Sequence, residues 1–446
     1  MQKKQSAKTR VLKFLAKQTK GQAKGWSYCD APDLRQQTKV EHPVNAVHWA
    51  LELGLTSNQR TLRDVEEMTE DLGLWARSLV PQSISDTTLD TESQRLEPDY
   101  LLKKLVQRVR GFHRSKMLDP VGLPCGVVTV DGKNLATLDH DADGTGHKRS
   151  KKNEKWHLSK DEETKRGDSY FLMPALRATL TSAEATPCIY QLPLPPGVGE
   201  STMFPEMFAE LKRAYGHGDM FRIVDGDAGL TSFHSASLIV DGGYEYVLGL
   251  KGNQPELHSE ANALLLSMAE TDEPEATTPW ECRNGGRIRR RLWRTDEMTG
   301  MENSVGKWTH LRQTWLVRQE TRGRGGKLEV EDRFFITSLP WDFLTPWQVL
   351  LLVRNHWAVE ITFNSLDLQW REDSGPWCTR GTSVWALGVL RLMAYNTAQI
   401  LRRRHLRKKK PNAPPNEYSA PPMAWRSLFR TIEKSLEFDT ETRCTG

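Results

Sequence analysis

The stretch Gly126-Val127-Val128-Thr129-Val130-Asp131-Gly132-Lys133 predicts the centre of the fold. Its four β-branched residues are typical of a buried strand, and this strand would end at Asp131. A second short apolar run, 221–224, ends in the same way at Asp225-Gly226-Asp227. Because ligand sites of open α/β sheets gather at strand ends, the two runs predict a site that contains acidic residues.

The pattern around these two runs predicts a mixed sheet with flanking helices. Strands are expected at 127–130, 170–180, 188–194, 221–224 and 244–250, and helices at 203–215 and 232–240. Three sequential strands followed by alternating strands and helices give the element order of the RNase H-like fold. The charged stretch 139–168 is expected to form a long loop.

The remaining sequence predicts several further parts. Residues 1–120 are expected to form a helical domain with a basic arm, because apolar residues recur there at helical spacing. Residues 277–340 are expected to be a β-rich insertion that divides the α/β core into 121–276 and 341–410. The Pro-rich stretch 411–422 would begin a C-terminal tail, 411–446.

The composition is that of an ordinary soluble globular protein of 446 residues with a net charge of +5. Its six cysteines form no CxxC pair and suit a reducing compartment. No signal peptide or membrane span is expected, which predicts a cytoplasmic, nucleoid-associated protein without a membrane partner. Basic residues cluster at 3–24 and 402–410; they are either solvated flexible segments or contacts to nucleic-acid phosphates.

A third acidic signal lies on the predicted helix that contains Arg354-Asn355-His356-Trp357-Ala358-Val359-Glu360. Glu360 shares a face with Trp357, where a carboxylate needs a partner. Taken singly, each acid is more often a helix cap, a turn residue or half of a salt bridge. Together, Asp131, an aspartate of 225–227 and Glu360 could hold two hard divalent cations that clamp a phosphodiester.

These motifs, in this order, resemble those of bacterial insertion-sequence transposases of the DDE class. The resemblance runs from about residue 85 to residue 404, and its motifs are Val130-Asp131-Gly132-Lys133, Asp227-Ala228-Gly229, Leu250-Lys251-Gly252-Asn253-Gln254, His356-Trp357-Ala358-Val359-Glu360, Leu366-Asp367 and Arg371-Glu372-Asp373. It implies that Asp131, Asp227 and Glu360 bind two Mg²⁺ or Mn²⁺ ions. It also implies double-stranded DNA as the partner, both transposon ends and target, and a homodimer or larger synaptic complex.

The chain departs from the family pattern at three points. Asp225 also ends its strand and is the alternative second aspartate, although the Asp-Ala-Gly context favours Asp227. Ile361 stands where many relatives have Asn, and His356 where many have Arg. These departures keep an inactive copy among the alternatives.

Several residues beside these acids are candidates for DNA contact. Lys251 and Gln254 could reach a phosphate or a base, or could form an ordinary polar turn. Lys133 could touch phosphate or neutralise the nearby carboxylates, and Trp357 is expected in the core rather than as a stacking platform. The DNA-binding candidates are Lys133, Lys251, Gln254, Arg354 and His356.

The sequence thus predicts an enzyme that cleaves transposon ends and transfers the freed strand into target DNA. One alternative is an RNase H-like metal-dependent nuclease without strand transfer. Another is an inactive, transposase-derived DNA-binding protein.

Overall fold

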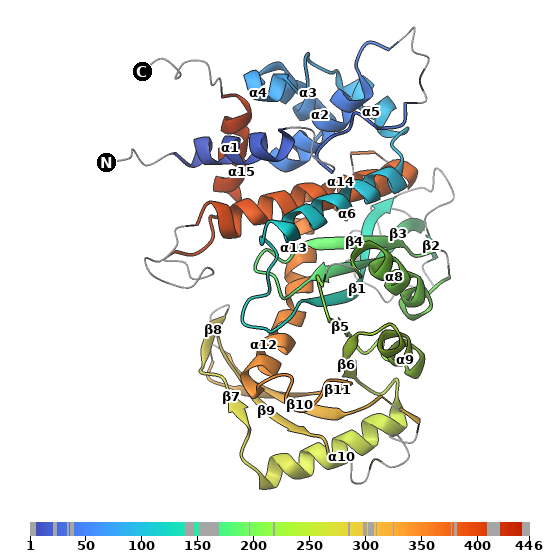
Figure 1. Cartoon of the computed structure of the whole chain (residues 1–446), viewed down its shortest axis with the longest axis vertical. Coiled ribbons are helices and arrows are strands. Elements are labelled where there is room, and N and C mark those ends of the chain that lie inside the picture. Colours follow the sequence, from blue (N-terminus) through green and yellow to red (C-terminus); the bar gives the residue numbers. More distant parts are fainter. Residues whose placement is uncertain are drawn as a thin grey trace.

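A computed structural model describes most of the chain. The described residues are 6–20, 25–33, 35, 40–138, 147–150, 169–195, 197–216, 219–283, 286–297, 301, 307–308, 310–323, 325–375, 377–378, 381–407 and 420–438. Helices gather at one end of the molecule, and a long twisted sheet fills the rest (Figure 1).

Five strands form the expected RNase H-like sheet, in the order β4-β3-β1-β5-β6. They are β1 (Val127–Leu138), β3 (Ser169–Leu180), β4 (Cys188–Pro193), β5 (Ile223–Gly226) and β6 (Glu245–Leu250). The first three strands along the chain pair antiparallel, whereas β5 and β6 continue the sheet parallel to β1. The predicted mixed sheet with flanking helices is therefore confirmed.

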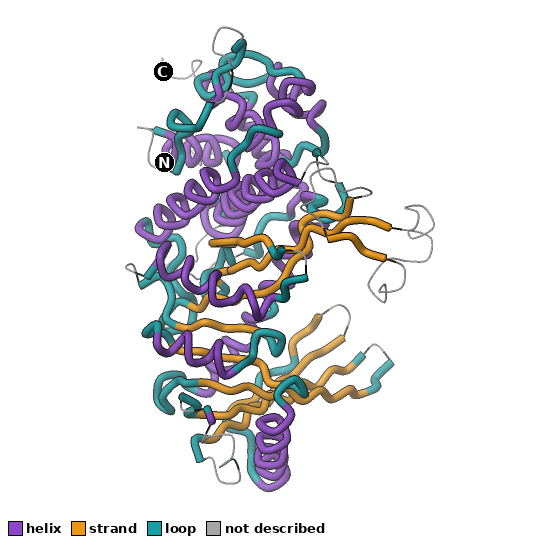
Figure 2. Tube along the Cα trace, turned by 90° about the vertical axis from the view of Figure 1, so that its right-hand side faces the viewer, coloured by secondary structure: helices purple, strands orange, loops and turns teal. Residues whose placement is uncertain are grey.

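The β-rich segment extends this sheet. Strand β11 (Leu328–Thr337) pairs antiparallel with β6, and β10 (Gln313–Arg322), β9 (Gly286–Thr295) and β7 (Ala276–Thr277) follow, with β8 (Glu281–Arg283) beside β9. Figure 2 shows these strands as one succession below the helices. The residues expected as an insertion thus share the sheet of the core, although the domain boundaries themselves stay a prediction.

One short strand lies where a loop is expected. Residues His147–Ser150 form β2, which pairs with β3, so the loop prediction is wrong for these four residues. The remainder of the expected loop, 139–146 and 151–168, lies outside the described residues.

Helices cover the two faces of the sheet. Val127, Ile223 and Val247 point to one face, where they pack against Val349 and Val353 of α12 (Pro346–His356). A capping box between Thr345 and Gln348, with Pro346 in the first turn, starts α12, and α13 (Ala358–Trp370) follows it directly. The opposite face carries α8 (Glu200–Tyr215), α9 (Phe233–Asp241) and α10 (Pro255–Thr271).

The N-terminal part is helical, as expected. It contains α1 (Ala7–Thr19), α2 (Val44–Ser57), α3 (Leu62–Glu70), α4 (Leu74–Arg77), α5 (Asp86–Ser93) and α6 (Pro98–Arg114). Helix α14 (Gly381–Ile400), which ends in a π-helical turn (Leu401–His405), packs on α2 and α6. We call this group, together with α15, the helical layer.

The described part of the segment expected as a C-terminal tail, residues 420–438, also belongs to the helical layer. Its helix α15 (Trp425–Leu436) packs against α1 and α2 (Figure 1). Leu428, Phe429, Ile432 and Leu436 are buried there. Among the described helices, none is both long and apolar enough to cross a membrane.

Candidate active site

Two adjacent parallel strands bring the aspartates together. Asp131 lies in β1, Asp225 in β5, and Asp227 directly after β5. The Thr129 hydroxyl donates a hydrogen bond of 2.7 Å to Oδ2 of Asp225 and thereby links the two strands. Because alternate residues of a strand share a face, Asp131 and Thr129 lie on the same side of β1.

The prediction that the first strand ends at Asp131 is wrong, because β1 continues to Leu138. Three carboxylates crowd the point where β1 and β5 stop pairing. Burial and the carboxylates of Glu200 and Asp227 raise the pKa of Asp131 to about 7, against one stabilising hydrogen bond of 2.8 Å from Gly132 N–H. Burial and Asp227 also raise the pKa of Glu200. A Cβ at position 132 would come within 1.8 Å of Oε1 of Glu200, so a larger residue at this position would displace the carboxylate.

Glu200 was not identified from the sequence. It occupies the first turn of α8, where a carboxylate commonly interacts with the helix dipole, and no sequence motif distinguishes it from such a residue. Only the folded arrangement brings it to Asp131 and Asp227.

Asp225 and Asp227 have different surroundings. Asp225 is 1% exposed, and its Oδ2 accepts hydrogen bonds from Thr129 and, at 2.8 Å, from Nδ1 of His356. Asp227 is half-buried and accepts backbone hydrogen bonds from Gly229 and Leu230, at 2.9 and 3.3 Å. Asp225 is therefore engaged within the protein, whereas Asp227 borders the surface.

His356 faces the aspartates. Burial lowers its pKa, but the carboxylates of Asp225, Asp131 and Asp227 outweigh burial and raise the pKa to about 9. The imidazole therefore carries a positive charge at neutral pH. A cation at this position suits the predicted contact between His356 and DNA. In this structure, Nδ1 of His356 donates a hydrogen bond to Asp225.

Glu360 lies just after the junction between α12 and α13. It is exposed in the first turn of α13 and makes no hydrogen bond or ion pair within the described part of the chain. The neighbouring Ile361 is 47% exposed. Among the described residues, no three His, Cys, Asp or Glu side chains are spaced to hold a metal ion. The structure brings Asp131 and Asp227 together, and the assignment of Glu360 to the metal site stays a prediction.

The other DNA-binding candidates lie in different environments. Lys133 forms an ion pair of 2.5 Å with Asp367 rather than with the crowded carboxylates. Gln254 donates to the backbone carbonyl of Thr231 at 3.1 Å, as expected for a polar turn. Arg354 pairs with Glu281 at 3.0 Å, and Lys251 is exposed.

The trailing Arg-Glu-Asp motif contributes to the interior of the protein. Glu372 and Arg177 of β3 are both 0% exposed and form two hydrogen bonds of 2.7 Å. Arg177 is paired in register with Asp131, so this ion pair fixes the strand beside the site. The motif therefore has a structural explanation in this chain.

The carboxylates of Asp131 and Asp227 are suitable ligands for a divalent cation. Hard cations take oxygen ligands, and a carboxylate such as Asp131, whose pKa is raised by burial and by neighbouring carboxylates, gains stability when positive charge is added. In addition, Oδ1 of the buried Asp225 has no hydrogen-bond partner among the described groups. The donor chemistry therefore fits Mg²⁺ or Mn²⁺.

Fold and site together define an RNase H-like protein with acidic residues in, and directly after, two adjacent parallel strands. Residues 126–397, more than half of the chain, match the family described as transposase DDE domain, and the chain belongs to this family. Proteins of this family generally use divalent metal ions.

One curated relative is described as "Uncharacterized protein in dhlA 3'region" of Xanthobacter autotrophicus. It is 33% identical to this chain over 104 residues, which cover 23% of the chain and 34% of the relative. The matched region thus spans about a third of the length of that protein.

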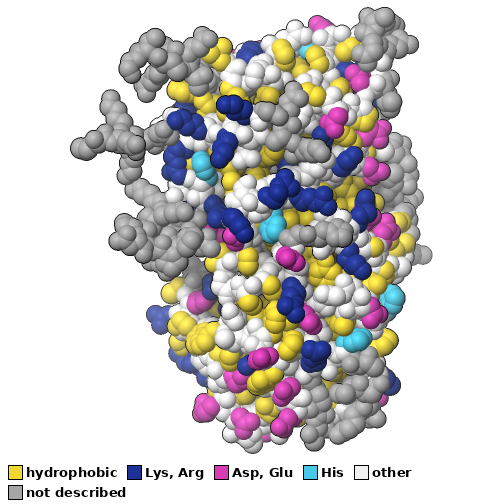
Figure 3. Space-filling model, viewed as in Figure 1, with side chains coloured by type: hydrophobic (Ala, Val, Ile, Leu, Met, Phe, Trp, Pro, Cys, Tyr) yellow, Lys and Arg dark blue, Asp and Glu magenta, His cyan; other side chains and the backbone are white. Residues whose placement is uncertain are grey.

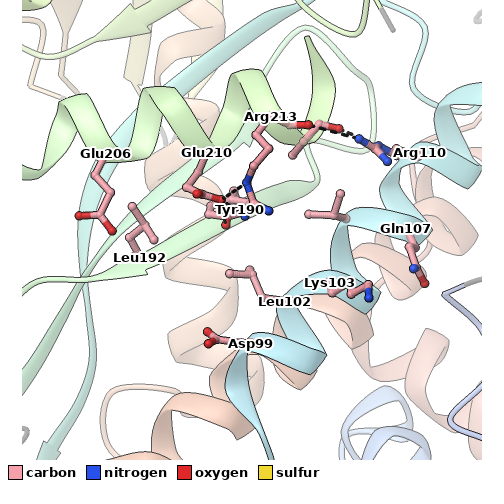
Figure 4. Close-up of a pocket in the computed structure, with 12 residues that line it drawn as sticks. Asp99, Leu102, Lys103, Gln107, Arg110, Tyr190, Leu192, Glu206, Glu210 and Arg213 are labelled. Atoms are coloured by element: carbon pink, nitrogen blue, oxygen red, sulfur yellow. Dashed lines mark hydrogen bonds and ion pairs between the residues drawn. The ribbon is translucent and has the colours of Figure 1, made fainter. Parts of the chain in front are cut away.

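A cleft of about 640 Å³ lies away from these carboxylates, between α6, α8 and β4 (Figure 4). Three of its charged side chains have local partners. Arg213 pairs with Glu210, which also accepts a hydrogen bond of 2.6 Å from the Tyr190 hydroxyl. Arg110 donates a hydrogen bond of 2.6 Å to the Ala214 carbonyl. None of the predicted site residues lines it.

Basic residues gather over the helical layer (Figure 3). Helix α6 carries the exposed Lys103, Arg110 and Arg114, and Arg404 bonds the Lys116 carbonyl at 2.7 Å. The basic segments are not simply flexible: residues Ala7–Thr19 form α1, and Arg402 stacks on Trp425. The remaining parts of the two basic clusters, 3–5, 21–24 and 408–410, lie outside the described residues.

Proposed function

We propose that this protein is an active transposase that cleaves DNA at the ends of a mobile element and joins the freed 3′-hydroxyl to target DNA. The observation that carries the proposal is the crowding of Asp131 of β1 and Asp227 directly after β5, in a chain of the transposase DDE family. Such crowding costs free energy unless cations are bound, which is typical of functional sites.

Asp131, Asp227 and Glu360 would hold two divalent ions. When bound, the ions supply activation of a water or 3′-hydroxyl and stabilisation of the leaving oxygen. Glu360 would complete the set from α13, where its carboxylate is exposed and without a described protein partner. Asp225 would act within the protein, by holding His356 in its charged form.

His356 would orient DNA beside the carboxylates. Its imidazolium lies where the negative charges of Asp131 and Asp227 raise its pKa. A phosphate that enters the site would meet this positive charge, and Asp225 fixes the ring through Nδ1. Lys251 is the exposed basic candidate on the neighbouring β6–α10 connection.

The DNA substrate would extend onto the helical layer. We propose that this layer, with its exposed basic residues on α6, recognises the element ends, and that two copies act together because two ends must be joined. The expected partners are thus double-stranded DNA and a second copy of the chain.

The direct test is cleavage and joining by the purified full chain on DNA that carries the element ends, with Mg²⁺ or with EDTA. We expect metal-dependent 3′-end cleavage and joining, and Glu360→Gln should lower the rate at least 100-fold because oxyanion and metal contacts depend on the charge. Glu206→Gln, a change at an exposed glutamate of α8, is the matched control.

The outcomes separate the alternatives. Cleavage without joining would identify a metal-dependent nuclease. End-specific binding without cleavage would identify an inactive DNA-binding relative. A Glu360→Gln variant with the rate of the unmodified protein would exclude Glu360 from the metal site.

A further inference from the structure

The junction between α12 and α13 carries two residues of the candidate site. Trp357 ends α12 and begins α13, with φ −66° and ψ −8°, and its carbonyl accepts the first hydrogen bond of α13, from Ile361 at 3.1 Å. His356 immediately precedes it, and Glu360 follows three residues later. Trp357 therefore lies between the two residues of the candidate site, at the point where one helix ends and the next begins.

Two arginines hold the Trp357 ring. The guanidinium of Arg290 lies 4.6 Å from the ring centroid, and that of Arg333 lies 4.4 Å from it. The ring is 8% exposed. Both distances are within the range of cation–π attraction, which strengthens when water is excluded. We call Arg290, Trp357 and Arg333 the tryptophan bracket.

The register of the strands explains why the arginines reach the ring from two sides. Arg333 of β11 is paired with Val317 of β10. On the other side of β10, Val317 is paired with Leu292 of β9, and Arg290 lies two positions from Leu292. Val317 and Leu292 pack beneath α12, so the alternation of side chains places both arginines on the face that α12 covers.

Acidic neighbours fix the bracket in place. Glu331 pairs with Arg333 at 2.9 Å. Glu281 lies 4.0 Å from Arg290, which is 2% exposed, and also pairs with Arg354 of α12 at 3.0 Å. Because Glu281 interacts with both β9 and α12, the sheet and the junction are joined by charge as well as by stacking.

We propose that Arg290 and Arg333 are positioning residues, which hold Trp357 so that His356 and Glu360 are set relative to Asp131 and Asp227. The strands β9 and β11 then support the reaction, because their arginines hold the α12–α13 junction in position. This inference rests on the proposed function, because it assigns Glu360 to the metal site.

The bracket is expected to affect the reaction step more than DNA binding. A displacement of about 1 Å at a reacting group can lower a rate about 100-fold. Arg333 is the better residue to change, since it is 32% exposed and its removal leaves less buried polar surface than removal of Arg290. Lysine keeps the charge near the ring, whereas methionine keeps only the length.

The first test compares Arg333→Met with Arg333→Lys, and Trp357→Leu with Trp357→Phe, on end cleavage. We expect kcat to fall 10- to 100-fold in the Met and Leu variants with KM for DNA within about twofold, and the Lys and Phe variants to recover most of the rate. A raised KM with unchanged kcat would overturn the proposal and would indicate direct DNA contact by the bracket. An unchanged kcat in Arg333→Met would also overturn it.

The second test does not depend on cleavage. Mn²⁺ binding to the full chain is measured by electron paramagnetic resonance for Arg333→Met, Glu360→Gln and the double variant. If the bracket acts through Glu360, the double variant loses no more affinity than Glu360→Gln alone. Additive losses would overturn the proposal, whereas an unmodified protein that binds Mn²⁺ through Glu360 but cleaves no DNA would contradict only the proposed function.

Discussion

Asp131 shows how a single residue can oppose the stability of the fold that contains it. Its carboxylate lies close to Glu200 and Asp227, and burial with these neighbours raises its pKa to about 7. A carboxylate whose pKa is raised by folding is disfavoured in its ionised form. The resulting loss of folding free energy is absent at pH values below about 3.9, the pKa of an unfolded aspartate, and is complete above the folded pKa.

We therefore expect Asp131→Asn to stabilise the metal-free protein at high pH only. At pH 8 the free energy of unfolding should rise by roughly 1–3 kcal/mol, and near pH 4 the two proteins should be about equal. Denaturant unfolding in EDTA at the two pH values measures this difference. Asp342→Asn, at an exposed aspartate, is the control, and equal stabilities at pH 8 would show that Asp131 is not crowded.

At the scale of elements, the ion pair between Arg177 and Glu372 joins β3 to the chain just after α13. Both side chains are fully buried, and Arg391 of α14 lies near enough to lower the pKa of Glu372, after Arg177 and Lys133. Burial itself raises that pKa, but the cations prevail. One carboxylate thus balances more than one buried guanidinium.

Glu372→Gln is expected to lower the free energy of unfolding by about 3–5 kcal/mol, because it leaves Arg177 charged and unpaired in the interior. The comparison is Glu256→Gln, which removes the exposed ion pair with Lys307 and should cost at most about 1 kcal/mol. Chemical denaturation of the unmodified protein and of both variants measures the two losses of unfolding free energy. Similar small losses would mean that water reaches Arg177.

Much of the arrangement of elements could be predicted from the sequence. Short β-branched runs that end in Asp131 and Asp225 identify β1 and β5, because a buried strand has a clear local pattern. The position of β11 beside β6 could not be predicted, since strand pairing depends on contacts between distant residues. For the same reason the sequence did not indicate the approach of Glu200 to Asp131. The place of Glu360 in the triad stays a prediction.

At the scale of the whole molecule, Trp370 joins the α/β core to the helical layer. It ends α13, and its indole N–H donates a hydrogen bond of 2.7 Å to the Leu55 carbonyl of α2. Its ring packs edge-on against Trp425 and Phe429 of α15, with centroids 5.4 and 5.3 Å away. The helix that carries Glu360 is therefore anchored at its far end in the helical layer.

Phe429→Ala should consequently destabilise the whole chain rather than α15 alone. Removal of this buried ring costs about 3–5 kcal/mol, and thermal unfolding is expected to remain a single transition at a lower temperature. Arg430→Ala, at the exposed neighbouring position, should shift the transition little. A separate early transition in Phe429→Ala would show that the helical layer unfolds independently of the core.

The sheet order also has a consequence for the time course of folding. Asp225 and Thr129 meet across 96 positions of the chain, and Ser435 of α15 bonds Lys8 of α1 across 427. Topologies built from such distant pairings fold slowly, over milliseconds to seconds, because loop closure comes before the contacts that compensate for it. The acidic residues would therefore converge late, after most helices have formed, and a newly made chain would pass through a period in which it has secondary structure but cannot yet capture a cation.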